Sequence, residues 1–269
     1  GDLHKVWPSL GLIADDLAGV DCLFHLAGLA HAGARGADRQ ALFHVNLDQT
    51  VNLYRQAVRA GVKRFIWLSS IKVLGDSSTR PLAVGAPYRP GDDYAASKAA
   101  AEQQLLSEPA GNTQLCIVRP PLVYGVGVQA NFLSMLRFAL SGWPLPFKSA
   151  TAPRAWLSVH NLVDLLLALG RAEGLPGQSI WHVRDAEETA VTDMLALMAR
   201  CAGRGLQQWP VPPGLAMWAA RLVGKGDMAA RLFLPLRVDM TETGAKLQWQ
   251  PEVAQSQAIE EVVHWYQTR

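Results

Sequence analysis

Three short runs of apolar residues, separated by longer helical stretches, constrain the fold of this chain more than any other feature. The runs are DCLFHLA (Asp21–Ala27), RFIWLSS (Arg64–Ser70) and QLCIVRP (Gln114–Pro120). Each is nearly continuous in apolar residues, as is typical of parallel strands that are covered on both faces. Between them, Ala37–Gly61 carries apolar residues at helical spacing, and Tyr94–Glu108 is rich in strong helix formers. The order strand, helix, strand, helix, strand predicts an α/β fold with a doubly wound parallel sheet.

The pattern changes after Pro120. Helices are expected at Asn131–Ser141, 160–174, Thr189–Cys201, Gly214–Val223 and Val253–Gln267, and strands at Ala155–Val159 and 179–185. We therefore predict two domains, a sheet domain over residues 1–120 and a smaller mixed C-terminal lobe over residues 121–269. Some segments of the second part are expected to return to the sheet domain.

The composition narrows the functional classes. Charged residues make up 18% of the chain and the net charge is +2, so no strong basic field favours a nucleic-acid partner. No apolar run approaches the roughly 20 residues that cross a bilayer, so we expect no transmembrane segment. The three cysteines (Cys22, Cys116 and Cys201) are far apart, which favours unpaired thiols in a reducing cytoplasm. We expect no metal site.

Tyr94 and Lys98 are four residues apart within an expected helix, so their side chains share one face. A tyrosine has an ordinary pKa of about 10, which is too high for a base at neutral pH, and a nearby ammonium lowers that pKa. The pair can therefore move a proton to or from a sugar or alcohol hydroxyl. Chance pairs of this kind are common on helix surfaces, so the pair alone predicts little.

Other motifs accompany the pair in a fixed order. FIWLSSIKVLGD (Phe65–Asp76) ends an expected strand, and VRPPLVYG (Val118–Gly125) and RAWLSVHNLVDLL (Arg154–Leu166) follow downstream of YAASK (Tyr94–Lys98). The chain closes with KLQWQPEVAQSQAIEEVVHWY. In type and order, these motifs resemble those of the extended short-chain dehydrogenase/reductases, the NAD-dependent epimerase/dehydratase family. The resemblance covers nearly the whole chain and implies a Rossmann-like dinucleotide-binding domain followed by a mainly substrate-binding lobe.

The resemblance implies roles for individual residues. Tyr94 is expected to be the acid/base, Lys98 to lower its pKa and hold the nicotinamide ribose, and Ser70 to be the catalytic hydroxyl. Ser70 is preferred to Ser69 because it stands five residues before Gly75, as in the family. The expected cofactor contacts are Asp2, Leu3, Ala27, Gly28, Asn46, Tyr94 and Lys98, and the expected substrate contacts are Ser70, Asn131 and Arg154.

Three residues near these motifs have plainer interpretations. Asn46 is equally well interpreted as a solvated residue on a helix. Arg154 is equally well interpreted as a solvated residue in a loop. His25, at the end of an expected strand, is interpreted as a packed core histidine rather than a catalyst.

The glycine-rich turn of the family is absent from its expected place. GLAHAGARG (Gly28–Gly36) follows the wrong strand, and no helix begins directly after it. The chain is therefore expected to begin after the first strand of the family, its helix and the next strand, and to lack most of the cofactor site. As given, it is not expected to bind cofactor or turn over. NAD and NADP remain alternatives, because the residue that selects between them follows the second strand of the family.

The resemblance implies a cytoplasmic enzyme of nucleotide-sugar metabolism. The first hypothesis is a 4-epimerase of a UDP-hexose or UDP-N-acetylhexosamine, in which Tyr94 takes the C4 hydroxyl proton while hydride passes to the cofactor. SSIKVLG, with Leu74 where the family often has tyrosine, resembles a subgroup linked to bacterial surface-polysaccharide sugars. It makes a UDP-4-keto-6-deoxy-sugar 4-reductase the close alternative.

Two further expectations concern partners. A non-catalytic dinucleotide sensor that binds a protein partner is the alternative of another class; it is disfavoured because such proteins usually lose the tyrosine or the lysine of the motif. A homodimer is also expected from the resemblance, through the helices Ala37–Ala60 and Tyr94–Glu108.

Overall fold

The computed structural model describes residues 17–30, 39–212, 214, 215, 218 and 232–269, and it divides the chain into two compact units. Unit 1 comprises Gly1–Gly75, Pro87–Arg119 and Leu166–Trp181, and unit 2 comprises Asp76–Ala86, Pro120–Leu165 and His182–Arg269. The sequence patterns placed Asp76–Ala86 in the first domain. In the structure this segment belongs to unit 2, because its strand pairs with a strand close to the C-terminus.

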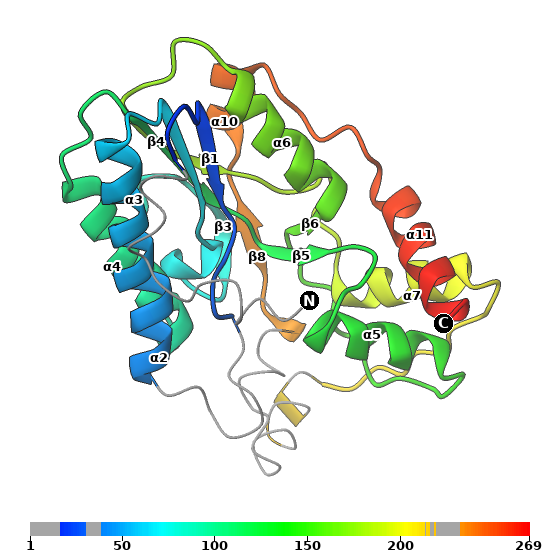
Figure 1. Ribbon diagram of the computed structural model, residues 1–269. Helices are drawn as coiled ribbons and strands as arrows, with labels where there is room; N and C mark the ends of the chain where they lie inside the picture. The colour runs from blue at the N-terminus through cyan, green and yellow to red at the C-terminus, as the bar shows by residue number, and fades with distance from the viewer. Residues whose placement is uncertain (1–16, 31–38, 213, 216–217, 219–231) are drawn as a thin grey trace. The chain divides into compact units, whose positions relative to one another are not determined.

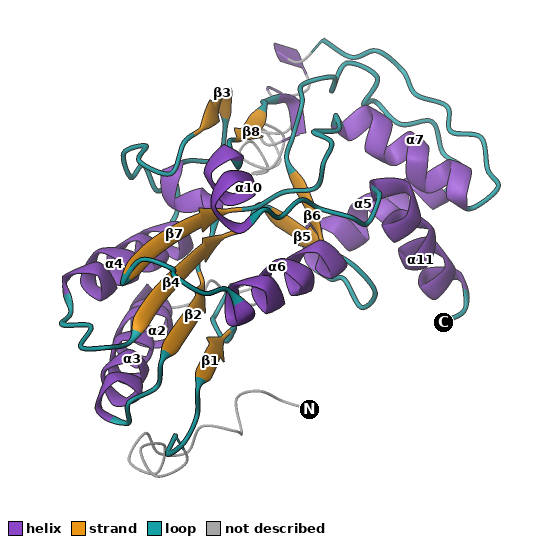
Figure 2. Ribbon diagram, turned by 90° about the horizontal axis from the view of Figure 1, so that it is seen from above, coloured by secondary structure: helices purple, strands orange, loops and turns teal. Residues whose placement is uncertain are grey.

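Unit 1 is built on a four-stranded sheet. The strands β1 (Cys22–His25), β2 (Arg64–Leu68), β4 (Gln114–Arg119) and β7 (Gln178–His182) lie side by side in that order (Figure 2). β2 runs parallel to both neighbours, with Phe65 opposite Leu23 on one side and Leu115 on the other. The predicted α/β fold with a parallel sheet is confirmed. The carboxyl ends of β1, β2 and β4 meet at one edge, which is where parallel sheets carry their chemistry.

Helices α2 (Arg39–Phe43), α3 (Thr50–Arg59) and α4 (Asp93–Ser107) lie together on one face of this sheet (Figure 1). Phe65 and Trp67 of β2 are fully buried in the apolar cluster that α3 and α4 form with the sheet. On the other face, the last turns of α6 (Val159–Arg171) approach closely. A Cβ added to Gly170 would lie 2.9 Å from the Phe24 ring.

The sequence predicts one helix over Ala37–Gly61, but the described part of that segment is divided. A π-helical turn, His44–Gln49, separates α2 from α3. It contains Asn46, whose side chain is fully buried. Short π-helical turns often occur at functional sites, because the extra residue turns a side chain out of the regular helical register.

Unit 2 combines two short pairs of parallel strands with several helices. β3 (Ser78–Leu82) pairs with β8 (Leu236–Val238), and β5 (Leu122–Tyr124) pairs with β6 (Trp156–Ser158). The helices are α5 (Ala130–Leu140), the first half of α6, α7 (Val191–Cys201), α10 (Thr241–Leu247) and α11 (Gln255–Gln267). Phe132, Met194 and Ile259, from α5, α7 and α11, are buried in one common apolar core.

The sequence patterns missed β3, β5, β8 and α10. These elements are three to seven residues long, too short to display a period of their own. The helix expected at Gly214–Val223 falls largely outside the described residues.

Gly125, directly after β5, has no room for a side chain. A Cβ there would lie 2.4 Å from Val159 Cγ1 and 3.0 Å from Val159 Cβ. We expect Gly125→Ala to lower the free energy of unfolding of unit 2 by about 1–3 kcal/mol, because a filled site takes an extra methyl group only with strain. Urea unfolding followed by circular dichroism measures the change.

Gly85→Ala is the matched control in the same unit, because a Cβ at Gly85 would meet no atom within 4 Å. The double variant Gly125→Ala/Val159→Ala should recover part of the loss by removing the clashing methyl groups. Equal unfolding midpoints for Gly125→Ala and Gly85→Ala would contradict the packing described here.

Candidate functional site

Ser70 lies directly after β2, at the carboxyl edge of the sheet. Its backbone is extended, with φ −158° and ψ 146°, and its Oγ accepts a hydrogen bond from Lys72 N (3.3 Å) at the start of a short 3-10 turn, Ile71–Leu74. Gly75 ends the turn with φ 133°, a conformation that favours glycine. The strand end and the glycine thus fix the backbone on both sides of the Ser70 hydroxyl.

The two neighbouring serines have different partners. Ser69 Oγ donates to Glu102 Oε1 (2.5 Å) in the interior of unit 1. The Ser70 side chain instead lies near the Tyr94 phenol and lowers the pKa of that phenol. The two neighbouring hydroxyls therefore have different surroundings, and the catalytic role of Ser70 stays a prediction.

Tyr94 lies in the first turn of α4, and its position depends on how that helix begins. Asp92 caps the helix, because Ala95 N donates to Asp92 Oδ1 (2.8 Å). Lys72 forms an ion pair with Asp92, and its Nζ lies 5.4 Å from the centre of the Tyr94 ring. The cap and the ion pair together tie the start of α4 to the turn that follows Ser70.

Burial raises the pKa of the Tyr94 phenol above its ordinary value. The nearby Ser70 side chain lowers this pKa, and the charge of Asp92 raises it further. The expected lowering by Lys98 is not found, since the side chains that shift this pKa are Ser70 and Asp92. Tyr94 is therefore a protonated phenol at neutral pH, able to donate a proton.

Lys98 lies one helical turn after Tyr94 and is 3% exposed. Its Nζ donates to Leu68 O (2.9 Å) and lies 4.7 Å from the centre of the Trp67 ring. Burial lowers the pKa of Lys98 to about 8, and the charge of Glu102 opposes this shift. An ammonium has three N–H donors, and only one of them is hydrogen-bonded to a described residue. The ammonium can therefore also bind a ligand.

Gly28 follows β1 and lies beside Lys98. A Cβ on Gly28 would be 3.0 Å from Lys98 Nζ and 3.2 Å from Asn46 Oδ1. Asn46 Oδ1 accepts from Leu29 N (2.9 Å), and its Nδ2 donates to Leu29 O (3.0 Å) and Ser97 Oγ (3.0 Å). Asn46 is fully buried, so its interpretation as a solvated helix residue is wrong. It holds the loop after β1 against α4 and leaves the exposed Gly28 backbone open to a ligand.

His25, at the end of β1, is buried, and its Nε2 is hydrogen-bonded to Thr50 Oγ1 (3.0 Å). Burial, together with the charge of Lys98, lowers the pKa of His25 to about 4, so the ring is neutral at pH 7. These contacts agree with a packed core histidine. Ala27 is half-buried in the loop that follows, and the expected cofactor contacts Asp2 and Leu3 lie outside the described residues.

In unit 2, Asn131 and Arg154 line one cavity of about 140 Å³. Much of its remaining wall is apolar and includes Phe147 and Trp156. Arg154 Nη1 donates to Leu234 O (2.6 Å), so the side chain is held in place and is not simply a solvated loop residue. A guanidinium beside an apolar wall suits a ligand that combines a phosphate with a flat apolar group.

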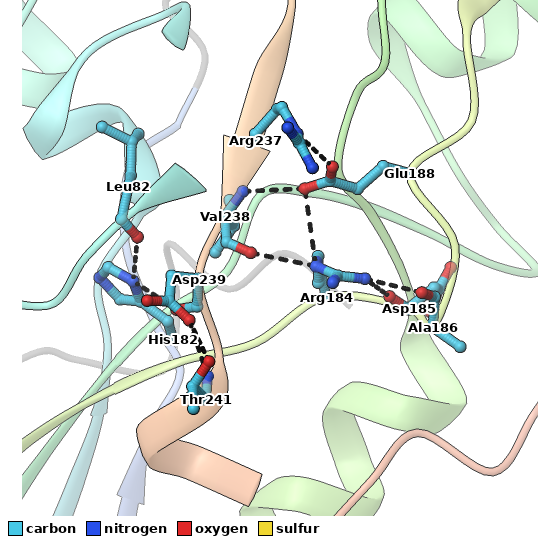
Figure 3. A network of polar contacts seen from close by, with 10 residues as sticks. All are labelled: Leu82, His182, Arg184, Asp185, Ala186, Glu188, Arg237, Val238, Asp239 and Thr241. Carbon is cyan, nitrogen blue, oxygen red and sulfur yellow. Dashed lines mark hydrogen bonds and ion pairs between the residues drawn. The ribbon is translucent and has the colours of Figure 1, made fainter. Parts of the chain in front are cut away.

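A larger groove of unit 2, about 560 Å³ in volume, contains none of the predicted site residues. Figure 3 shows two arginines of its lining directed at Glu188, with Arg237 Nε 2.8 Å from Oε2 and Arg184 Nε 3.6 Å from Oε1. Arg184 Nε also donates to Val238 O (3.0 Å). These contacts fasten β8 to the segment that follows β7, so we interpret the network as structural.

Sequence reasoning missed three polar residues around Tyr94 and Lys98. Asp92 carried a signal, because aspartate directly before an alanine-rich helix is a typical N-cap. Lys72 and Glu102 carried none, since their partners Asp92 and Ser69 are 20 and 33 residues away in the chain. Within the described residues, no group of three or more side chains that could hold a metal ion is found, and no helix is long and apolar enough to cross a bilayer.

Comparison with known proteins adds independent findings. Residues 10–183 match the model of the NAD dependent epimerase/dehydratase family. The chain is 37% identical over 237 residues to a UDP-glucose 4-epimerase of Vibrio cholerae, an alignment that covers 84% of this chain and 71% of that protein. It is also 35% identical over 230 residues to the sterol demethylase protein B of Methylococcus capsulatus, covering 84% of this chain and 67% of that one.

Among solved structures, the chain is similar to a UDP-glucuronic acid 4-epimerase from Bacillus cereus in complex with NAD. The TM-score is 0.76 at 16% identity, and the match covers 95% of this chain and 75% of that one. At this identity the likeness concerns the fold.

The burial of Lys98 predicts a particular effect on stability. Its folded-state pKa of about 8 lies below the ordinary 10.5, so the unfolded chain binds more protons between these values and the free energy of unfolding rises with pH there. Below pH 8 the full penalty of burying the charge applies. We expect Lys98→Met to raise the free energy of unfolding at pH 7 by up to about 3 kcal/mol, an advantage that shrinks towards pH 10.

Urea unfolding at pH 7 and pH 9.5 measures this difference. Lys63→Met is the matched control in unit 1, because Lys63 is exposed and its pKa is raised by its hydrogen bond with Asp21. That control should show no such pH dependence between pH 7 and 9.5. A lower free energy of unfolding for Lys98→Met at pH 7 would show that burial is not the dominant effect on this lysine.

Proposed function

This chain belongs to the NAD dependent epimerase/dehydratase family, and from that membership we propose that it is a nucleotide-sugar 4-epimerase acting on a UDP-hexose or UDP-N-acetylhexosamine. One observation carries the proposal. Within unit 1, the Ser70 side chain lies near the Tyr94 phenol, whose pKa it lowers, and Lys98 follows Tyr94 on the same helix one turn later. A proton-transfer group, a hydrogen-bond donor and a cation are thus gathered at the carboxyl edge of a parallel sheet.

The residues at this edge fit a dinucleotide cofactor. NAD, when bound, supplies a hydride acceptor and donor. The open Gly28 backbone allows close approach of such a ligand beside Lys98 and Asn46, where a Cβ would crowd both side chains. Lys98, with N–H donors to spare, is assigned to the hydroxyls of the nicotinamide ribose. NADP is the alternative cofactor.

Tyr94 and Ser70 are assigned to the reacting oxygen of the sugar. Tyr94 exchanges the proton of the C4 hydroxyl as the carbon is oxidised and reduced. Ser70 donates a hydrogen bond to the same oxygen while charge develops on it. The nearness of the two side chains supports this assignment, because a common partner oxygen requires them to lie close together.

The cavity of unit 2 supports a substrate with a nucleoside diphosphate. Arg154 is assigned to the diphosphate, which a guanidinium binds with two parallel hydrogen bonds. Asn131 supplies further donors from the start of α5. The apolar wall around Phe147 and Trp156 suits the face of a base. The identity of 37% to a UDP-glucose 4-epimerase favours uridine.

A UDP-4-keto-6-deoxy-sugar 4-reductase is the second candidate function. The raised pKa of Tyr94 favours it, because a protonated phenol is ready to donate a proton to a sugar oxygen as a ketone is reduced. An epimerase needs the same group as a base in its first half-reaction, which requires the bound cofactor or substrate to lower that pKa.

Replacement of Tyr94 by Phe tests whether the protein is an enzyme of this kind. We expect Tyr94→Phe to lower kcat at least 100-fold, because the proton then has no side chain to carry it. Tyr266→Phe, on α11, is the matched control and should keep its rate. A Tyr94→Phe variant with unchanged turnover, or a protein that binds dinucleotide and never turns over, would support the sensor interpretation instead.

The two candidate reactions differ in their need for reduced cofactor. We expect UDP-glucose or UDP-N-acetylglucosamine to be inverted at C4 without added reductant, as product analysis by NMR would show. If NADPH is instead consumed in equal amount with a UDP-4-keto-6-deoxy sugar, and UDP-hexoses are left unchanged, the reductase is the correct assignment. UDP itself should inhibit in either case, whereas an Arg154→Met variant should bind it more weakly.

A further inference from the structure

A buried carboxylate that the proposed chemistry does not use lies directly behind the site. Glu102 is on α4, one turn after Lys98, and is completely buried. It accepts hydrogen bonds from Ser69 Oγ (2.5 Å), Tyr88 OH (2.9 Å) and Arg119, whose Nη2 lies 2.6 Å from Oε2 and whose Nε lies 3.0 Å from Oε1. A carboxylate without partners would be very costly at this depth, so the arrangement is a fully connected polar network.

The donors to Glu102 come from the chain segments that build the site. Ser69 is the residue before Ser70, and its N–H donates to Val118 O (2.8 Å) in continuation of the ladder between β2 and β4. Arg119 is the last residue of β4. One carboxylate on α4 therefore joins the carboxyl ends of two central strands to the helix that carries Tyr94 and Lys98.

We propose that Glu102 is a positioning residue of the active site, which fixes the strand end that carries Ser70 by anchoring Ser69 and places a buried negative charge one helical turn from Lys98. The proposal rests on the proposed function for the roles of Ser70, Tyr94 and Lys98. It adds a residue that touches neither substrate nor cofactor and acts through its neighbours.

The surroundings of Lys98 show why a nearby negative charge matters. From β1 it faces His25, which is neutral at pH 7 because its pKa is about 4. From β2 it faces the Trp67 ring and the Leu68 carbonyl, which carry no charge. On its own helix it is flanked by the Tyr94 phenol and by Glu102. Glu102 is the anion that raises the pKa of Lys98 against the effect of burial.

Three variants separate the two parts of the role. Ser69→Ala removes the link to the Ser70 backbone and leaves the Glu102–Arg119 pair intact. Glu102→Asp keeps the charge but shortens the reach to Ser69. Glu102→Gln removes the charge and keeps the shape. Glu108→Gln, at the C-cap of the same helix and paired with the half-exposed Arg55, is the matched control for charge removal.

Steady-state kinetics tests the positioning role. We expect Ser69→Ala and Glu102→Asp to lower kcat about tenfold with KM changed less than twofold, because the loss affects the reacting geometry rather than substrate binding. Glu108→Gln should keep both constants. Wild-type values for Ser69→Ala and Glu102→Asp would overturn this part of the proposal.

The charge role is measured without any assay of activity. The pKa of Lys98 is read from the ¹⁵N-lysine NMR signal that disappears in Lys98→Met. We expect a value of about 8 in the wild type, little change in Glu102→Asp and Glu108→Gln, and a fall of about one unit or more in Glu102→Gln. The apparent pKa of the alkaline limb of the pH–rate profile should fall by the same amount.

The outcomes are distinguishable. An unchanged Lys98 pKa in Glu102→Gln would refute the charge role, even if the variant were inactive. If Glu102→Gln does not fold, because the buried Arg119 loses its ion pair with Glu102, the comparison of Glu102→Asp with Ser69→Ala decides the positioning role. A wild-type protein that turns over no nucleotide sugar would refute the proposed function, while the NMR titration would still test the link between Glu102 and Lys98.

Discussion

The parallel ladder between β2 and β4 is the interaction on which the rest of unit 1 depends. Both strands are largely buried, and a buried backbone donor or acceptor without a partner costs about 1–3 kcal/mol. The register is therefore held firmly, with Arg64 opposite Gln114 and Leu68 opposite Val118. A slip by one residue would turn every side chain to the other face of the sheet. The positions of Ser70 and Arg119, just beyond this ladder, follow from the same register.

The second constraint is how closely α4 approaches this ladder. Ala101 of α4 packs with Phe65, Trp67 and Leu115 in one buried apolar cluster, and its small side chain suits a close approach of the helix to the sheet. This close approach also buries Lys98 and Glu102. Burying a single charge in unit 1 is far more costly than a surface ion pair is favourable, so the electrostatics of the site are governed by desolvation. The lowered pKa of Lys98 and the raised pKa of Tyr94 both have burial as their largest cause.

The comparisons show how little of the sequence this architecture requires. The Bacillus cereus structure shares the fold at a TM-score of 0.76 with only 16% identity. A fold of this kind is set by where apolar residues recur and where strands and helices end, and many sequences satisfy those conditions. Chemistry is less tolerant, because it depends on individual groups such as the Tyr94 phenol at the carboxyl edge of the sheet. The family can therefore be established while the substrate still depends on a few side chains.

The sequence by itself determined the class of fold, the three central strands, the helix that carries Tyr94 and Lys98, and the family, because apolar periodicity and motif order are local properties of the chain. The preference for Ser70 over Ser69, which came from the spacing to Gly75, stays a prediction. The sequence did not determine that Asn46 is buried in a π-helical turn, that Asp76–Ala86 joins unit 2, or that Glu102 pairs with Ser69 and Arg119. Only the tertiary structure decided these points, because each depends on contacts between segments far apart in the chain. The pKa of a buried group is likewise decided only by the tertiary structure. It is set by what surrounds the group in space and not by its neighbours in sequence.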